Sequence, residues 1–256
     1  MATERMYAAE RHQAIIDWGE ERGRVDVREL AGELGVSVET VRKDLSALQS
    51  MGLMRRVHGG AVPVNRLSFE QQISSRTEWS EEKERIAVAA LEYVPESGTI
   101  FVESGSTTSR LGEHLPDDRD LTVYTNSLPL ALALAPREGI TVITLGGRVR
   151  AVTLGEVDNF AQRSLREIFV DVAFLGTNGV SLDHGLTTPD AAEAEIKRLV
   201  LKAARQRVLL ADHSKIGATS VWRYGDIEDI DVLITDEIPR ATAADIQARG
   251  TEVRIV

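Results

Sequence analysis

The stretch that decides the fold near the start of the chain is Gly35-Val36-Ser37-Val38-Glu39-Thr40-Val41-Arg42-Lys43-Asp44-Leu45. Gly35 is suited to end one helix, because glycine readily adopts the left-handed conformation that follows a helix, and Ser37 is suited to cap the next one. Apolar side chains then recur at helical spacing, which predicts a helix over Val38–Ser50 with an apolar stripe of Val38, Val41, Leu45 and Leu48. Two helices joined by a short turn that contains glycine are typical of a helix-turn-helix.

The residues before this stretch predict two more helices. Apolar side chains at helical spacing favour a helix over residues 6–21, and Gly23 is a natural place for it to end. Asp26 with Glu29 three positions later predicts a capping box at the start of a short helix over residues 27–34. Three helices around the turn are therefore expected.

The residues after the stretch predict a β-hairpin. Residues 53–57 change from apolar to basic, and His58-Gly59-Gly60-Ala61 turns the chain sharply. We interpret this hairpin as a wing whose arginines approach phosphates, so that residues 1–62 form a winged helix-turn-helix domain.

The polar side chains of the third helix face away from its apolar stripe. A recognition helix needs such a packed inner face and short polar side chains near its N-terminus, which reach base edges in the major groove. The alternative is an ordinary small helical domain with a charged, solvated face, but the turn spacing together with the wing favours DNA binding. The residues expected to contact DNA are Ser37, Glu39, Thr40, Arg42 and Lys43 of the helix and Arg55, Arg56 and His58 of the wing.

This part of the chain resembles a known family. Residues 37–45, followed by Arg56-Val57-His58-Gly59-Gly60-Ala61, resemble the DNA-binding signature of DeoR-type bacterial transcriptional repressors, and Arg11 and Ile15 also fit that pattern. Gly19 departs from it, since an aliphatic residue is usual there, and we therefore expect the first helix to end early. The resemblance implies double-stranded operator DNA as a partner.

The composition sets limits on the class of protein. With 256 residues, 43% of them hydrophobic, the chain favours two globular domains. It has no cysteine, which excludes a disulfide framework, a thiol nucleophile and cysteine-ligated metal. No apolar run is long enough for a membrane span and residues 1–11 are too polar for a signal peptide, so we expect a cytoplasmic protein without a membrane partner.

The net charge of −10 argues against DNA binding only if it is spread evenly. Residues 1–66 carry ten lysines and arginines against ten acidic residues, and residues 67–256 hold the whole negative balance. Within the first segment, residues 40–66 carry a charge of +4. The positive charge is therefore local to the predicted helix and wing.

The rest of the chain predicts an α/β domain. Residues 63–79 have weak periodicity and are interpreted as a linker with one short helical turn, and Ser80 is suited to cap a helix that runs to about Leu91. Short apolar runs then alternate with helical stretches, which predicts a mainly parallel sheet covered on both faces over residues 80–256. The runs are residues 99–102, 121–124, 140–145, 170–175, 208–211, 232–234 and 253–256.

Polar or glycine-rich breaks follow five of these runs. In parallel sheets, ligands bind beyond the carboxyl ends of the strands, and amide N–H groups at a helix start attract anions. Each break taken alone could be a helix cap, a turn or a surface lysine, but their recurrence in register favours a site for a small phosphorylated polyol. The expected effector-binding residues are Glu103, Ser104, Gly105, Ser106, Thr107 and Thr108; Thr125, Asn126 and Ser127; Gly146 and Gly147; Asn178 and Gly179; and Lys215.

This half of the chain also resembles the DeoR-type family, in its effector domain, which is similar in fold to ribose-5-phosphate isomerase. The loops quoted above stand in the order and spacing of that family, so the resemblance covers essentially the whole chain. It implies that a sugar phosphate held by these loops controls DNA binding. Glu103 stands where the family often has Asp.

Catalysis is not expected. Asn178 stands where isomerases of this fold have Asp, and an amide cannot act as a base. Glu193 is expected to make an exposed contact with Lys197 four residues on, rather than to form a catalytic pair with Glu195. Neither His184 nor His213 has partners at metal-ligand spacing, so we expect no metal and no cofactor.

The sequence therefore predicts a regulator, most simply a repressor of sugar-metabolism genes. One recognition helix covers only a few base pairs, so a homo-oligomer, dimer or tetramer, is expected on repeated or palindromic half-sites. A sugar-phosphate isomerase with a DNA-binding appendage is the alternative, and no residue distinguishes a repressor from an activator.

Overall fold

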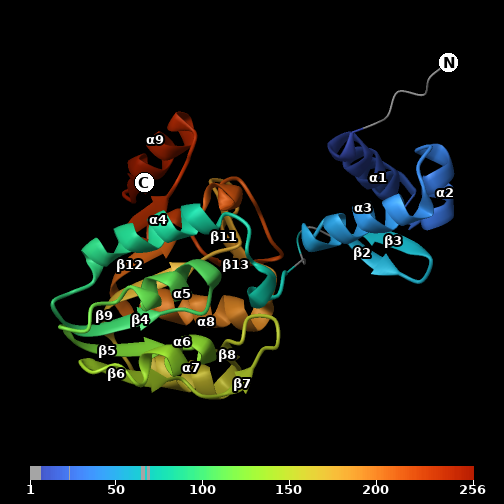
Figure 1. The fold of residues 1–256 in the computed structure, drawn as a ribbon. Helices are drawn as coiled ribbons and strands as arrows, with labels where there is room; N and C mark the ends of the chain where they lie inside the picture. Colours follow the sequence, from blue (N-terminus) through green and yellow to red (C-terminus); the bar gives the residue numbers. More distant parts are fainter. Residues whose placement is uncertain (1–6, 23, 65–66, 68–69) are drawn as a thin grey trace. The chain divides into compact units, whose positions relative to one another are not determined.

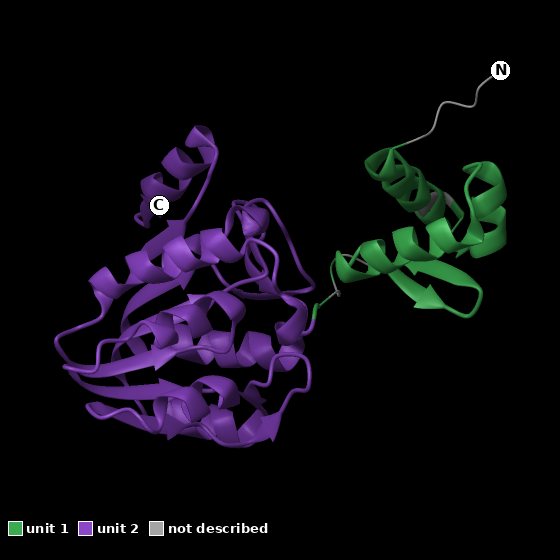
Figure 2. Cartoon of the chain, viewed as in Figure 1, with its two compact units in different colours: residues 1–71 green, residues 72–256 purple. Residues whose placement is uncertain are grey.

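The computed structural model describes residues 7–22, 24–64, 67 and 70–256. The chain divides into two compact units, residues 1–71 and residues 72–256, which Figure 2 colours separately. Each unit has a hydrophobic core of its own, so we describe the two units one at a time.

Unit 1 is a winged helix-turn-helix, as predicted. Three helices pack on a small antiparallel sheet of strand order β1-β3-β2, and their apolar side chains form one core around Val41, Leu45 and Leu48, which are fully buried. The third helix begins and ends where the sequence predicted. The elements are α1 (Ala8–Arg22), β1 (Val25–Asp26), α2 (Val27–Glu33), α3 (Val38–Ser50), β2 (Met54–Val57) and β3 (Gly60–Pro63).

The turns between the helices follow from local chemistry. Asp26 caps α2, because its carboxylate accepts from the amides of Arg28 and Glu29, at 2.8 and 3.3 Å. The other half of the predicted capping box is not formed by Glu29, whose carboxylate accepts from Arg22 Nη1 at 2.8 Å. Gly35 has a φ of +63°, the left-handed conformation that ends α2 and allows α3 to begin.

The expected early end of α1 is wrong. The helix continues through Gly19 to Arg22, whereas the predicted boundaries at Met6 and Gly23 lie outside the described residues. A Cβ atom at Gly19 would lie 3.0 Å from Met54 Cε and 3.1 Å from Pro63 Cγ. Glycine is therefore used here for close packing of α1 on the hairpin, at a cost in helix propensity.

Unit 2 is built on a seven-stranded sheet in which every neighbouring pair of strands is parallel (Figure 1). The strand order is β15-β14-β12-β9-β4-β5-β6. All seven predicted apolar runs are strands of this sheet, which confirms the predicted fold class. The strands are β4 (Ser97–Val102), β5 (Asp120–Thr125), β6 (Ile140–Thr144), β9 (Val170–Gly176), β12 (Ala204–Leu210), β14 (Val232–Thr235) and β15 (Glu252–Ile255).

Helices cover both faces of the sheet. Two separate hydrophobic clusters, one for each face, hold their buried side chains. In Figure 1, α4 and α5 lie in front of the sheet and α8 lies behind it. The helices of the first face are α4 (Ser80–Ala90), α5 (Ser106–Glu113) and α6 (Leu128–Leu134), and those of the second are α7 (Asp158–Arg166), α8 (Ala191–Lys202) and α9 (Arg240–Ala248).

Shorter elements lie around the sheet, and the sequence predicted one of them, the short helical turn within residues 63–79, but none of the others. A two-stranded ribbon pairs β7 (Arg148–Val149) with β8 (Glu156–Val157), and a three-stranded antiparallel sheet joins β10 (Gly179–Ser181), β11 (Gly185–Thr188) and β13 (Trp222–Gly225). The 3₁₀ turns are η2 (Ile73–Ser75), η3 (Leu91–Tyr93), η4 (His213–Lys215) and η5 (Ile227–Asp229). Across the residues that the structure describes, no helix has the length and apolar character to cross a membrane, and no three potential ligands cluster to hold a metal ion.

Candidate DNA-binding surface and effector site

The outer face of α3 carries the residues expected to contact DNA. Ser37 caps the helix, since its Oγ accepts from the amide of Thr40 at 3.1 Å. Glu39, Arg42 and Lys43 are exposed and Thr40 is half-buried. The helix therefore presents polar and basic side chains on one face, as the sequence predicted.

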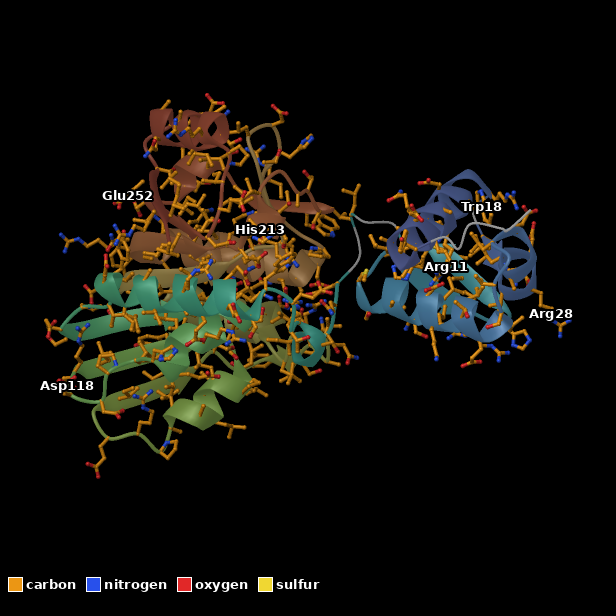
Figure 3. All side chains as sticks on the ribbon, turned by 45° about the horizontal axis from the view of Figure 1, so that its top comes forward. Arg11, Trp18, Arg28, Asp118, His213 and Glu252 are labelled. Carbon is orange, nitrogen blue, oxygen red and sulfur yellow. The ribbon has the colours of Figure 1, made fainter. Side chains whose placement is uncertain are left out.

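Asp44 is a residue of α3 whose role the sequence analysis missed. Its carboxylate is buried and forms a bidentate ion pair with Arg11 of α1, with Nε–Oδ2 and Nη2–Oδ1 distances of 2.7 and 3.0 Å, while His12 Nε2 lies 3.2 Å from Oδ1. Figure 3 shows Arg11 inside unit 1, whereas Arg28 points away at its edge. Burial alone would raise the pKa of Asp44, but the hydrogen bonds and charges of Arg11 and His12 outweigh burial and lower it. This ion pair fixes α3 against α1.

The wing is fastened to α3 by one arginine. Arg55 and Arg56 are both exposed on β2, and Arg56 Nη1 donates to Ser46 Oγ of α3 at 3.2 Å. Successive side chains of a strand point to opposite faces, so Arg55 lies on the other face of the hairpin. His58 is exposed in the turn, where its carbonyl accepts from Arg24 Nη2 at 3.0 Å.

In unit 2, the loop after β4 leads into α5 at Ser106, as predicted. Within the described part of the chain, no acceptor is hydrogen-bonded to the amide N–H groups of Gly105, Ser106 and Thr107. A Cβ atom at Gly105 would lie 2.8 Å from Thr108 Oγ1, and that hydroxyl donates to the carbonyl of Gly105. Thr108 thus packs directly against Gly105 at the start of α5, and the first amides of the helix are available to an anion.

Three of the expected effector residues, at the end of β5 and in the loop that follows it, stabilise the carboxyl edge through hydrogen bonds of their polar atoms. Asn126 Oδ1 accepts from the amide of Ser104 at 2.8 Å, and its Nδ2 donates to Ser104 Oγ at 3.3 Å. Thr125 donates to the carbonyl of Val102 at 2.6 Å, and Ser127 caps α6. Asn126 therefore ties the loops after β4 and β5 to each other.

Glu103 forms a buried ion pair with Lys197 of α8, which the sequence analysis did not foresee. Lys197 Nζ lies 2.6 Å from both carboxylate oxygens and donates to the carbonyl of Gly176 at 2.9 Å, while the amide of Gly176 donates to Glu103 Oε2 at 3.0 Å. Burial raises the pKa of Glu103, against the opposing charge of Lys197. The pair joins the ends of β4 and β9 to α8.

The expected exposed contact between Glu193 and Lys197 is wrong. Both side chains are buried, and Glu193 Oε1 accepts instead from Arg150 Nη1 at 2.6 Å and from Thr153 Oγ1. The reason is that α8 is covered by the β7–β8 segment, which supplies Arg150, so neither residue faces solvent. Helical spacing alone could not reveal a partner so far away in sequence.

The glycines of the remaining breaks allow close approach of neighbouring segments. Gly146 and Gly147 have φ angles of +74° and +111°, and a Cβ atom at Gly147 would lie 2.5 Å from the carbonyl oxygen of Val157. A Cβ atom at Gly179 would lie 2.4 Å from the carbonyl oxygen of Ala218.

Two polar side chains of the edge differ in their bonding. Asn178 Oδ1 accepts from Thr188 Oγ1 at 3.1 Å. Lys215 is half-buried in η4 and forms no ion pair with any residue that the structure describes. Lys215 is therefore a cation at the carboxyl edge that no carboxylate of the described residues meets directly.

Comparison with known families identifies both units. The DeoR-like helix-turn-helix domain matches residues 11–66, and the DeoR C-terminal sensor domain matches residues 78–237. The chain belongs to the DeoR family. The resemblance expected from residues 37–45 and from the strand-end loops is thereby confirmed.

The DeoR-family chain is similar to curated regulators over nearly its whole length. It is 34% identical to the HTH-type transcriptional regulator GlpR of Haloferax volcanii, covering 97% of this chain and 98% of the relative. It is 32% identical to the HTH-type transcriptional repressor GlcR of Bacillus subtilis, covering 98% and 97%. It is 31% identical to the glycerol-3-phosphate regulon repressor of Escherichia coli, covering 91% and 93%.

Solved structures similar to this DeoR-family chain include ribose 5-phosphate isomerase A from Neisseria gonorrhoeae. The two are 22% identical over 56% of each chain, with a TM-score of 0.39. An overlap of this size says nothing about the activity of this protein.

Proposed function

We propose that this DeoR-family protein is a transcriptional repressor whose operator binding is controlled by a phosphorylated sugar or polyol. The observation that carries the proposal is that one chain has two such surfaces, one on each unit. Unit 1 presents an exposed basic helix and wing, and unit 2 presents free amides at the start of α5 on the edge of the sheet that also carries Lys215. The similar GlpR and GlcR proteins are named as a transcriptional regulator and a transcriptional repressor, and the glycerol-3-phosphate regulon repressor is named for a phosphorylated polyol, which supports the same role here.

In this proposal the helix-turn-helix reads the operator. Thr40, Arg42 and Lys43 lie on the outer face of α3, where they reach base edges or the neighbouring phosphates together with Glu39. Ser37 contacts the backbone from the start of the helix, and Arg55, Arg56 and His58 do so from the wing. Since one helix covers only a few base pairs, the protein acts as a homo-oligomer, dimer or tetramer, on paired half-sites.

The effector phosphate is proposed to bind at the start of α5. The amides of Gly105, Ser106 and Thr107 supply donors, the dipole of the helix favours negative charge, and Lys215 supplies a cation. The other predicted residues hold this arrangement in place, since Asn126 ties down Ser104, and Glu103 is held by Lys197.

The bonding of the charged side chains supports a sensor rather than an enzyme. Three of the ionisable side chains near this edge, Glu103, Glu193 and Lys197, are buried and paired with an opposite charge. A general base needs a free lone pair within reach of the substrate. We propose that these groups stabilise the edge of the sheet and do no chemistry.

The test uses the full chain, duplex DNA that the chain selects from a random pool, and glycerol 3-phosphate within a panel of phosphorylated sugars. Replacing Arg42 and Lys43 with Ala should weaken binding and reduce the salt dependence, by roughly one unit of slope for each phosphate that the variant no longer neutralises. Arg28→Ala, an exposed arginine on α2, is the matched control (Figure 3). If the variant with Ala at positions 42 and 43 binds DNA like the unaltered chain, as the control is expected to do, α3 does not carry the DNA surface.

The effector part is tested by thermal stability and by release from DNA. A phosphorylated ligand should raise the melting temperature by mass action and change operator affinity. Replacing Ser106 and Thr107 with Leu should abolish both responses and leave operator affinity unaltered. A normal response in this variant would mean that the phosphate binds elsewhere, and turnover of ribose 5-phosphate by the purified chain would favour an isomerase.

A further inference from the structure

The segment that leads from residue 72 into α4 is held on the carboxyl edge of the sheet of unit 2. The amide of Ile73 donates to the carbonyl of Val152 at 2.8 Å. Lys83 Nζ donates to the carbonyl of Glu78 at 2.6 Å and to that of Arg76 at 3.5 Å. Residues 63–71 come directly before this segment in the sequence. The connection between unit 1 and the sheet therefore enters unit 2 at these contacts.

Lys83 is a buried ammonium whose hydrogen-bond acceptors come from the backbone of this segment. It is buried on α4 and, among the described residues, it forms no ion pair with a carboxylate. Burial lowers its pKa, Asp212 opposes that effect, and Lys215 reinforces it. The carbonyls of Arg76 and Glu78 therefore solvate a charge that lies close to the loop carrying Lys215.

Trp79 makes the third contact, with the same loop. Its ring meets the ring of His213 edge-on, with the ring centroids 4.3 Å apart. His213 is itself fixed at the ends of β12 and β14, since its amide and its Nδ1 contact the carboxylate of Asp236 at 2.7 and 2.6 Å. Trp79 has a φ of +58°, a strained conformation for a residue other than glycine, and its side chain remains 43% exposed.

We propose that Lys83, Trp79 and His213 form a latch through which effector binding is transmitted to the DNA-binding unit. This inference rests on the proposed function, in which the phosphate lies at the edge that includes Lys215. His213 and Lys215 belong to one 3₁₀ turn, so a ligand that moves Lys215 moves the partner of Trp79. Added negative charge near Lys83 also competes with the two carbonyls for its ammonium.

The segment that the latch holds is suited to switching because most of its residues are exposed. Residues 74–75 and 77–80 are exposed, and local opening of such segments needs little energy compared with unfolding the sheet. When the latch opens, residues 72–79 are released from unit 2, and this release is the step that lowers operator affinity. Allosteric coupling of this kind typically changes affinity by about 5- to 150-fold.

The test compares two latch variants of the full chain, Trp79→Ala and Lys83→Met, with the unaltered chain. The matched control is Trp222→Ala, since Trp222 is exposed to a similar degree, 47%, but lies on β13. Without any ligand, the latch variants should bind selected operator DNA about fivefold or more weakly than the control. Trypsin should also cleave after Arg76 about fivefold or more faster in the latch variants, because the segment that contains Arg76 opens more often.

The outcomes separate the latch from the proposed function. If the latch variants bind operator and lose affinity on addition of glycerol 3-phosphate just as the control does, the latch is refuted while the sensor stands. If the unaltered chain selects no duplex, or no phosphorylated sugar of the panel shifts its melting temperature, the proposed function fails and the latch fails with it. If the latch variants bind weakly, still gain stability from the ligand and no longer respond to it on DNA, the latch is supported.

Discussion

Removing the buried carboxylate of α3 should destabilise unit 1 strongly. In the variant Asp44→Asn, Arg11 loses the charge of its bidentate partner in α3, at a place where the side chains of Asp44 and Arg11 are only 7% and 13% exposed. Breaking a buried ion pair by removing one partner costs about 3–5 kcal/mol, and the slight exposure of Arg11 places this case near the lower value, about 3 kcal/mol. A unit of 71 residues has a free energy of unfolding of roughly 4–10 kcal/mol, so the variant loses a large share of it.

The matched control is an ion pair of the same unit that lies in solvent. Arg22 and Glu29 are 2.8 Å apart with side chains 43% and 57% exposed, so Glu29→Gln should cost less than about 1 kcal/mol. Trp18 is the one tryptophan of unit 1, and its fluorescence in a Trp79→Phe, Trp222→Phe background reports denaturant unfolding of that unit alone. Equal losses in Asp44→Asn and Glu29→Gln would refute the assignment of the pair as the joint between α1 and α3.

The same pair predicts a pH dependence. Because the pKa of Asp44 is lower in the folded unit than in the unfolded chain, the pair stabilises unit 1 above the ordinary carboxyl pKa of about 4. That stabilisation is lost as the pH falls through the lowered pKa of the folded state. Asp44→Asn should therefore flatten the fall of unit 1 stability below about pH 4, measured with the same Trp18 signal.

Two further predictions concern packing and charge. Gly19→Leu should destabilise unit 1 by about 1–3 kcal/mol in the same assay, since its Cβ would lie 3.0 Å from Met54 Cε; a neutral result would mean that Met54 moves aside freely. Lys197→Met should destabilise unit 2 by about 3–5 kcal/mol because it leaves the carboxylate of Glu103 buried alone, and adding Glu103→Gln should restore most of that stability. Calorimetric unfolding of the single and double variants measures the coupling, and strictly additive effects would contradict a paired role.

The sequence predicted the elements that depend on hydrophobic periodicity. The helix Val38–Ser50 and all seven strands of the main sheet have apolar patterns long enough to identify them. The strands β7, β8 and β10 have only two or three residues, and the tertiary contacts that create them leave no periodic signal. They were missed for that reason.

Buried charges were the main features that the sequence concealed. Asp44, Lys83, Glu193 and Lys197 belong to residue types that normally face solvent, and all four are buried. A partner distant in sequence meets Asp44, Glu193 and Lys197, whereas Lys83 donates to carbonyls only five and seven residues away. Only Asp44 carried a usable signal, since it stands three residues after Val41 and next to Leu45 on the apolar side of α3. The partners of Glu193 and Lys197 lie 43 and 94 residues away, a separation that helical spacing cannot encode.

The burial of Asp44 also explains how an acidic chain can present a surface for DNA. The carboxylate is the one acidic group within residues 40–66, and Arg11 and His12 neutralise it inside the unit. Residues 40–66 therefore expose Arg42, Lys43, Arg55 and Arg56 and no carboxylate, although Arg42 Nη1 lies 3.6 Å from Oε2 of Glu39, just before this segment. Arg56 Nη1 of the wing donates to Ser46 Oγ of α3, which places its charge beside the helix. Screening limits the reach of distant charges to about 8–10 Å at physiological salt, so the negative balance of residues 67–256 opposes DNA only where it comes that close. Local arrangement of charge, and not the total of −10, decides whether unit 1 can bind a polyanion.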